Sequence, residues 1–391
     1  MEEWKEYKLG TLTDRKIGYG IVQPGASVSG GVPVIKVNNI ISGLRNVEEL
    51  ETTSKDNDAK YSRTKLIGGE LIISVVGTIG KTAIVPMSFA GCNLVRATCL
   101  IDIKDKQLVS WVKYYIDSPQ GQRYIHENLN TTVQPTLNVK SLVDMPIPMY
   151  SSEYMKKAVA ILKSLDDKIE VNRKINENLE QQAQALFKSW FVDFEPFKNG
   201  EFIESELGMI PKGWRVGKLG ELCQFKRGKG LLSKNAIPGD VPVVAGGLEP
   251  ACYHNISNTK APVITVSGSG ANAGFMRMYH QEVWASDCSF IDITCENWLF
   301  VYCFLAINSH LLRHAQTGAV QPHVKPADIH DFDLAIPPKE NIQTFQDIIS
   351  SFITKKGLLE QESRRLAELR DTLLPRLMSG ELKVNDIENK L

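Results

Sequence analysis

Hydrophobic residues recur at alternating steps of four and three along two long segments of the chain, the heptad pattern of a helix that packs along one seam. The pattern predicts one helix over residues 153–191 and another over residues 340–378. Both seams lie in one chain and stay in phase at a separation of 187 residues, so we expect the helices to pair as an antiparallel intramolecular coiled coil. The expected pairing positions are Leu162, Leu165, Ile169, Leu179, Leu186, Ile349, Phe352, Leu359, Leu366 and Leu373.

Polar residues occur at seam positions of the first helix, and the second helix contains a proline. Asn172 and Asn176 occupy seam positions of the first helix, where a polar side chain can fix the register at some cost in stability. A water-filled kink at these two positions is an equally open interpretation. Pro375 lacks a backbone N–H group, so it is expected to kink or end the second helix in its last turns.

The rest of the chain has short β-rich runs, each set followed by an apolar helical stretch. The runs cover residues 33–37, 70–76 and 94–103, and then 241–245, 262–267 and 288–294. Single helices are expected near 108–126 and 297–315. Each set therefore predicts a mixed α/β globular domain, and each is closed by a proline-containing segment, "MPIPM" or "AIPPK", before a long helix begins.

The two halves of the chain contain an internal sequence repeat. The opening "WKEYKLGTL" at Trp4 returns as "WRVGKLGEL" at Trp214, and "KIGYG" returns as "KRGKG" at the same offset of 210 residues. Farther along, "VQP" at Val133 returns at Val320, at an offset of 187. The expected fold is α+β with an internal pseudo-two-fold repeat. We expect a domain at 1–150, a helix at 151–198, a second domain at 199–338, and a helix with a tail at 339–391.

One loop has the ending of a phosphate-binding loop, "ISVVGTIGKT" at residues 73–82. A P-loop requires glycine where this loop has Val75, and it opens a helix, whereas "AIVPMSFAG" follows here and favours a strand. The matching loop of the second copy, "VITVSGSGANAG", has no Gly-Lys-Thr. The glycines of both loops, which include Gly77, Gly80, Gly268 and Gly270, are therefore expected to permit tight turns and not to hold a nucleotide.

Composition restricts the classes of function. The chain has 391 residues, 45 basic and 45 acidic, and no apolar run of membrane-spanning length. Seven cysteines form no Cys-x-x-Cys pair and the histidines supply no ligand spacing, so we expect buried free thiols in the cytoplasm and no metal. Residues 1–152 carry 17 basic against 15 acidic side chains and residues 200–338 carry 11 against 13. Tight DNA binding would therefore need positive surface from a partner.

Two globular copies, each followed by a long helix, resemble the specificity subunit of type I restriction–modification systems. The segments "NENLEQQAQALFKSWFVDFEPF" (176–197) and "LAELRDTLLPRLMSGEL" (366–382) look like the two spacers of that family. The "W…KLG.L" opening of each copy also fits, and the resemblance covers essentially the entire chain.

The resemblance implies that each copy is a target recognition domain for one half of a bipartite, asymmetric double-stranded DNA sequence. It implies that the helices act as a ruler between the half-sites and dock two adenine-methyltransferase subunits, which restriction/translocase subunits join. A member of this family does no chemistry and needs no cofactor. The sequence agrees, because "AIPPK" (335–339) has the prolines of a methyltransferase Asn-Pro-Pro-Tyr motif but neither its polar nor its aromatic residue.

Bases are read by side chains with paired donors or acceptors, such as Arg, Lys, Asn and Gln, which points to polar and basic loops. The candidates of the first domain are Lys16, Lys36, Asn38, Asn39, Thr78, Lys81 and Gln134. Those of the second domain are Lys226, Arg227, Lys229, Ser269, Asn272, Gln321 and His323. Each of these residues has an alternative role as ordinary solvated surface. The two glutamines recur beside proline in both copies, so they have a further alternative role as parts of a turn.

Three other functions remain open from the sequence. The chain could be the specificity subunit of a related system that cuts on both sides of its site. It could also be a protein-binding scaffold with two adhesive domains on a coiled-coil stalk, which would show no salt-sensitive duplex binding. A nucleotide hydrolase built on the Lys81 loop ranks last and would lose turnover in Lys81→Ala.

Overall fold

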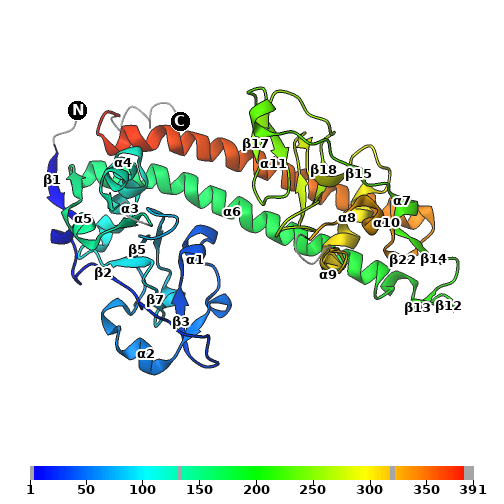
Figure 1. Ribbon diagram of the computed structural model, residues 1–391, viewed down its shortest axis with the longest axis horizontal. Coiled ribbons are helices and arrows are strands. Elements are labelled where there is room, and N and C mark those ends of the chain that lie inside the picture. Colours follow the sequence, from blue (N-terminus) through cyan, green and yellow to red (C-terminus); the bar gives the residue numbers. More distant parts are fainter. Residues whose placement is uncertain (1–3, 131–133, 318–321, 383–391) are drawn as a thin grey trace. The chain divides into compact units, whose positions relative to one another are not determined.

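The computed structural model describes residues 4–130, 134–317 and 322–382, and it divides into two compact units. The first unit comprises Met1–Lys168 and Arg365–Leu391, and the second comprises Ile169–Arg364. Two 40-residue helices, α6 (Ser152–Phe191) and α11 (Lys339–Met378), contribute a segment to each unit (Figure 1). The two predicted long helices are confirmed to within one residue at each end.

The segments of α6 and α11 run antiparallel within each unit, as predicted. In the first unit the Tyr154 hydroxyl, near the start of α6, donates to the carbonyl of Leu377 near the end of α11 at 2.8 Å. Farther along α6, the carboxylate of Asp166 accepts a hydrogen bond from Arg370, which lies earlier in α11, at 2.8 Å. Later positions in α6 therefore contact earlier positions in α11, as in an antiparallel pair.

The predicted pairing positions all lie in the less exposed faces of the two helices. Leu162, Ile349 and Leu359 are buried. The other seven are half-buried: Leu165, Ile169, Leu179, Leu186, Phe352, Leu366 and Leu373. The helix α11 continues through Pro375 and ends one turn later, at Met378. The proline removes one backbone donor, and the helix ends three residues after it, in agreement with an end in the last turns.

Asn172 is a fully buried polar side chain in the second unit. Its Nδ2 donates to Glu362 Oε2 at 2.7 Å and to Ser363 Oγ at 3.3 Å, both on α11. Its Oδ1 has no hydrogen-bond partner within the described residues. This half-satisfied amide supports the interpretation of a register device, because a buried acceptor without a donor costs stability while the donated bonds fix the pairing.

Replacing Asn172 with leucine is expected to raise the stability of the second unit by about 1 kcal/mol, since it removes the unpaired acceptor and adds apolar burial. Glu362 has further interactions and would not be left alone. Thermal unfolding should then shift upward by roughly 2–4 °C. Exposed Asn178 of the same helix provides the control Asn178→Leu. A lower melting temperature in Asn172→Leu would contradict this account.

The globular domain of the first unit is built from small sheets. Its four-stranded sheet has the order β2 (Gly18–Tyr19), β8 (Thr98–Ile101), β5 (Leu71–Ser74), β6 (Thr82–Ile84), with all pairs antiparallel. Its three-stranded sheet has the order β4 (Thr52–Thr53), β3 (Val32–Ile35), β7 (Asn93–Leu94), in which β7 is parallel to β3. Two antiparallel pairs complete it, β1 (Lys5–Lys8) with β11 (Pro146–Met149) and β9 (Leu129–Asn130) with β10 (Thr136–Leu137).

The domain of the second unit repeats this plan. Its four-stranded sheet has the order β15 (Lys226–Arg227), β21 (Cys288–Asp292), β18 (Val263–Ser267), β19 (Met276–Tyr279). Its three-stranded sheet has the order β17 (Cys252–His254), β16 (Val241–Val244), β20 (Trp284–Ala285), in which β20 is parallel to β16. The pair β14 (Arg215–Lys218) and β22 (Asp333–Ile336) matches β1 and β11, and one further hairpin, β12 (Phe202–Ser205) and β13 (Gly208–Pro211), precedes it. The predicted internal repeat is confirmed at the level of strand order.

Each predicted single helix at 108–126 and 297–315 is in fact two helices. The first breaks at Ser118, whose side chain caps the next helix by accepting from the N–H of Gly121, while Pro119 occupies its first turn. A residue before proline avoids the helical region, which explains the break. The second breaks at Asn308. The short helices are α1 (Val37–Ser42), α2 (Lys55–Ala59), α3 (Val109–Asp117), α4 (Pro119–Glu127), α5 (Val139–Asp144), α7 (Leu219–Leu222), α8 (Trp298–Ile307), α9 (Ser309–His314) and α10 (Pro326–His330).

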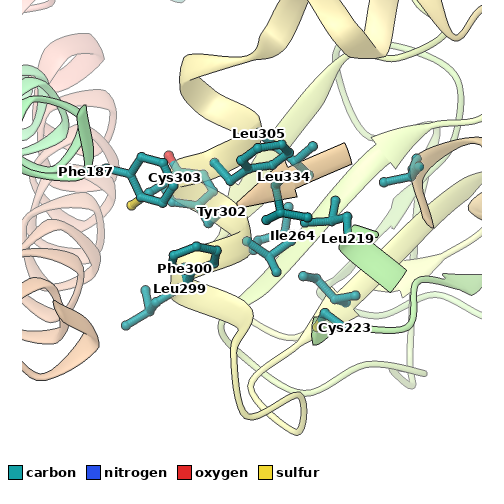
Figure 2. Close-up of a cluster of buried hydrophobic side chains, with 14 of the residues drawn as sticks. Phe187, Leu219, Cys223, Ile264, Leu299, Phe300, Tyr302, Cys303, Leu305 and Leu334 are labelled. Atoms are coloured by element: carbon teal, nitrogen blue, oxygen red, sulfur yellow. The ribbon is translucent and has the colours of Figure 1, made fainter. Parts of the chain in front are cut away.

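The core of the second unit joins its domain to the long helices. Helix α8 is apolar around its whole circumference, as expected of a helix covered on all sides. Figure 2 shows Leu305 of α8 beside Ile264 and Leu334 of the domain, and Phe187 of α6 on the opposite side of α8. The first unit has its own core, in which the indole N–H of buried Trp111 donates to the carbonyl of Pro148 at 2.8 Å.

A polar clamp accompanies this core in the second unit. The Tyr302 hydroxyl of α8 donates to Glu180 of α6 at 2.8 Å, and Lys356 of α11 donates to the same carboxylate at 2.6 Å. Burial alone would raise the pKa of Glu180, but Lys356 and the hydrogen bonds outweigh it and hold the pKa below the ordinary 4.5. Burial and the adjacent carboxylate raise the pKa of Tyr302 far above its usual range, so Tyr302 remains a donor. One carboxylate thus links the domain to both long helices.

Replacing Glu180 with glutamine is expected to lower the free energy of unfolding by about 1–3 kcal/mol at pH 7, because Lys356 loses its buried partner. The folded pKa of Glu180 is depressed, so its contribution is present above about pH 4.5 and is lost as the pH falls through the folded pKa. Denaturant unfolding followed from pH 7 into the acid range should show the gap between variant and wild type closing as the pH falls below 4.5. Glu249→Gln, at a carboxylate with an 82% exposed side chain, is the control. A pH-independent gap would contradict this assignment.

The expectation of free thiols is wrong for two of the seven cysteines. The structure joins Cys223 and Cys295 in a disulfide across 72 residues, with their Cα atoms 6.2 Å apart. The other five are free, and four of these are buried while Cys252 is half-buried. The pairing is non-local, at the ends of α7 and the start of α8, so the sequence spacing could not indicate it. Within the described residues, no group of three or more His, Cys, Asp or Glu side chains could hold a metal ion, and no helix is long and apolar enough to span a membrane.

Candidate nucleic-acid interface

The same two polar loops meet in both globular domains. In the first domain the loop after β5 contacts the start of β10, where the Leu137 N–H donates to the Val75 carbonyl at 3.0 Å. In the second domain the loop after β18 contacts the segment before α10, where the Val324 N–H donates to the Gly268 carbonyl at 3.1 Å. The loops that carry many of the predicted DNA contacts are therefore neighbours in space, although they are about 60 residues apart in sequence.

The loop with the Gly-Lys-Thr ending is a hairpin between antiparallel strands. It joins β5 to β6, as predicted, so a strand directly follows the loop where a P-loop would open a helix. Gly77 and Gly80 have positive φ values of 76° and 83°, so both require glycine. The Ser74 hydroxyl closes the loop by donating to the Thr78 carbonyl at 2.6 Å and accepting from the Lys81 N–H at 2.9 Å.

A hollow of about 410 Å³, with apolar walls and four polar side chains, lies in the first domain at the meeting of these loops. Lys36 and Gln134 line it, together with Arg96 and Thr136. Of the two cations that line the hollow, Arg96 has no carboxylate partner within the described residues. Lys36 reaches out of it to Glu51, with 2.5 Å between Nζ and Oε1. The arrangement suits an anionic ligand that also offers hydrogen-bonding edges, which is the chemistry of a nucleic acid.

The other candidates of the first domain lie outside this hollow. Lys81 lines a separate hollow of about 300 Å³ with Asp166 and Arg370 of the long helices. Asn39 accepts from the Lys36 N–H at 2.7 Å and so caps α1, which is a structural role. Lys16, Asn38 and Thr78 are exposed.

In the second domain the candidates Arg227 and Ser269 both contact Asp287. The guanidinium of Arg227 forms an ion pair with the Asp287 carboxylate, which also accepts from the Ser269 hydroxyl. Gly268 directly follows β18, and a Cβ there would lie 2.3 Å from Arg227 Nη1, the far end of a flexible side chain that can move aside. Gly270, with φ of 80°, permits the turn, as expected.

The remaining candidates of the second domain are more scattered. His323 lies beside Ser269 through an isolated β-bridge, and Asn272 donates to the Gly246 carbonyl at 3.4 Å. Lys229 is exposed next to Trp284, whose indole donates to the Lys229 carbonyl at 2.8 Å. Lys226 lines a different hollow near Asp292. Gln321 lies outside the described residues.

Two residues that the sequence analysis missed occupy this part of the domains. Arg96 was hidden in a predicted continuous strand over 94–103, which the structure breaks between β7 and β8. Asp287 carries a negative charge, which the criterion of cationic and amide side chains excludes. An exposed arginine within an otherwise buried apolar run was the available signal, since charged side chains are seldom buried without a partner.

Comparison with known proteins identifies the family. A family model described as "Type I restriction modification DNA specificity domain" matches residues 1–181 and 211–369. The MjaIX type I restriction enzyme specificity subunit of Methanocaldococcus jannaschii is 29% identical over 313 residues, covering 73% of this chain and 71% of that protein. The HindI specificity subunit of Haemophilus influenzae is 24% identical, with 98% of this chain and 100% of that protein covered.

A solved structure supports the fold. The crystal structure of a type I restriction–modification S subunit from M. genitalium matches with a TM-score of 0.53 at 16% identity, covering 96% of both chains. The family model covers both globular copies and most of the two long helices. The chain therefore belongs to the type I restriction–modification DNA specificity family, as a specificity subunit and not a catalytic one.

Proposed function

We propose that this chain recognises a bipartite, asymmetric double-stranded DNA sequence. Each globular domain, at residues 1–150 and 199–338, reads one half-site, while α6 and α11 set the distance between the half-sites. One observation carries the proposal: the two domains share strand order and loop placement but present different side chains at the meeting of their loops. The first presents Lys36, Arg96 and Gln134, and the second presents Arg227, Ser269 and Asp287. A shared scaffold with different chemistry suits two unlike half-sites.

The same proposal assigns the long helices to partner binding. Two adenine-methyltransferase subunits dock there, and restriction/translocase subunits join the assembly. In support, the helices keep large apolar side chains exposed, two of which, Val171 and Ile175, lie one turn apart on α6, so that a protein surface could cover them together. These side chains are Val171, Ile175, Ile348, Leu358 and Leu369. The zero net charge also fits a chain whose partner supplies part of the positive surface.

The direct test is methylation by the reconstituted complex. The chain with its methyltransferase should methylate a random duplex library at a split motif with a fixed unspecified gap, and duplex binding should weaken steeply as salt rises. The methyltransferase without this chain is the control. Assembly of a stable complex that methylates or binds without sequence preference would favour a protein-binding scaffold instead.

A further inference from the structure

The connection that leads from the three-stranded to the four-stranded sheet holds the same place in both domains. In the first domain residues 95–97 run from β7, parallel to β3, into β8. In the second domain Ser286 and Asp287 run from β20, parallel to β16, into β21. The two connections are therefore counterparts in the repeat. Each carries one charged residue: Arg96 in the first domain and Asp287 in the second.

Arg96 is a cation on a fixed backbone. Its N–H donates to the Ile21 carbonyl at 2.8 Å, and it lies between the buried residues Val95 and Thr98. Its side chain is exposed along the hollow that Lys36 and Gln134 also line, and no carboxylate within the described residues pairs with it. An arginine on a surface usually finds a counter-ion or points to open solvent, whereas this one faces a hollow that other polar side chains line.

Arg227, on β15, is the exposed cation that contacts this connection in the second domain, and Asp287 positions it. The Asp287 carboxylate holds the guanidinium from one side, and the glycine at 268 lets Nη1 approach the backbone. The hydroxyl of Ser269 fixes the carboxylate in turn. The Arg227 side chain nevertheless remains 46% exposed, so donors of its planar group are still available to a ligand.

We infer that Arg96 and Arg227 each read a guanine, one in each half-site, and that Asp287 is the positioning residue for Arg227. The inference rests on the proposed function. Its chemical basis is that a guanidinium offers two parallel donors that match O6 and N7 of guanine in the major groove. The Arg227 guanidinium is already held by Asp287 and therefore loses less conformational freedom on binding, which favours base recognition over a general phosphate contact.

The test compares the methylation motifs of wild-type and variant complexes on the same random duplex library. In Arg96→Ala, one guanine of one half-site should lose its requirement, with methylation at the original site falling about 5- to 150-fold. Arg227→Ala should do the same in the other half-site. Asp287→Asn should relax the same base position as Arg227→Ala, to a smaller extent. Exposed arginines of the same domains provide the matched controls Arg63→Ala and Arg313→Ala, which should leave the motif unchanged.

Arg96→Lys separates base recognition from phosphate contact, because lysine keeps the charge but loses the paired donors. We expect this variant to relax the same guanine position. A uniform fall in methylation across all sequences, with every base preference intact, would overturn the inference and assign Arg96 to the DNA backbone. An unchanged motif in Arg96→Ala or Arg227→Ala would also overturn it. Neither outcome touches the proposed function, which fails only if the wild-type complex yields no split motif. Thermal unfolding of each variant confirms that it is folded.

Discussion

Alanine at position 187 is expected to lower the free energy of unfolding of the second unit by about 3–5 kcal/mol, the cost of removing a large buried aromatic side chain. Phe187 is 2% exposed. Its ring centroid lies 4.9 Å from that of Phe191, 5.1 Å from that of Phe300 and 5.6 Å from that of Phe345. These rings belong to α6, α8 and α11, so the substitution opens a cavity where the domain meets both helices.

Differential scanning calorimetry measures this effect. The melting temperature of the second unit should fall by about 10 °C, given roughly 2–4 °C per kcal/mol for a unit of this size. The first unit has a separate core around Trp111, so its unfolding should change little. Phe275→Ala, at a ring that is 41% exposed in the same unit, should change stability by less than about 0.5 kcal/mol. A drop of less than about 1 kcal/mol in Phe187→Ala would contradict the assigned core.

Matched insertions of one heptad in both long helices are expected to lengthen the unspecified gap of the DNA target. The insertion points are the junctions Lys168/Ile169 in α6 and Arg364/Arg365 in α11, where the chain passes from one unit to the other. Duplicating residues 162–168 and 358–364 at these points keeps the seam in phase and leaves the contacts inside each unit intact. Seven residues at 1.5 Å each add about 10 Å, which corresponds to about three base pairs of duplex.

The single insertions are the controls for this experiment. Seven extra residues in α6 alone should disrupt pairing with α11, lower thermal stability and abolish methylation of the split motif. The matched pair should restore both folding and methylation, now on a motif with a longer gap and the same half-sites. A folded, active double insertion that keeps the original gap would contradict a spacer role for the helices.

The sequence was most informative where a local pattern repeats many times. The seam of α6 and α11 extends over ten or more turns, so small local deviations such as Asn172 could not obscure it, and both helices were predicted to within a residue. The repeated "W…KLG.L" openings likewise indicated two copies, and the strand orders of the two domains agree. Helices and repeats can be predicted from such patterns because the patterns do not depend on which distant segments of the chain are in contact.

Features that depend on non-local contacts could not be predicted in the same way. The break of the 94–103 run exposes Arg96 because Val95 and Arg96 bond to distant segments at Ile35 and Ile21. The carboxylate of Asp287 meets Arg227 across 60 residues. Of the positions selected as DNA contacts, the structure places Lys36 and Gln134 in one hollow but puts Lys81 in another, against the long helices. The candidates were predicted from their side-chain chemistry alone, whereas their positions in space depend on the tertiary fold.

The central claim is that this chain determines which DNA sequence is methylated. The most direct measurement is the map of adenine methylation across the host genome, with and without the gene for this chain, in cells where the partner methyltransferase is verified to be produced. The account predicts that a split motif with a fixed gap is methylated in the parent and loses its marks on deletion, and that the gene supplied in trans restores them. Survival of every methylated motif after deletion would contradict the claim.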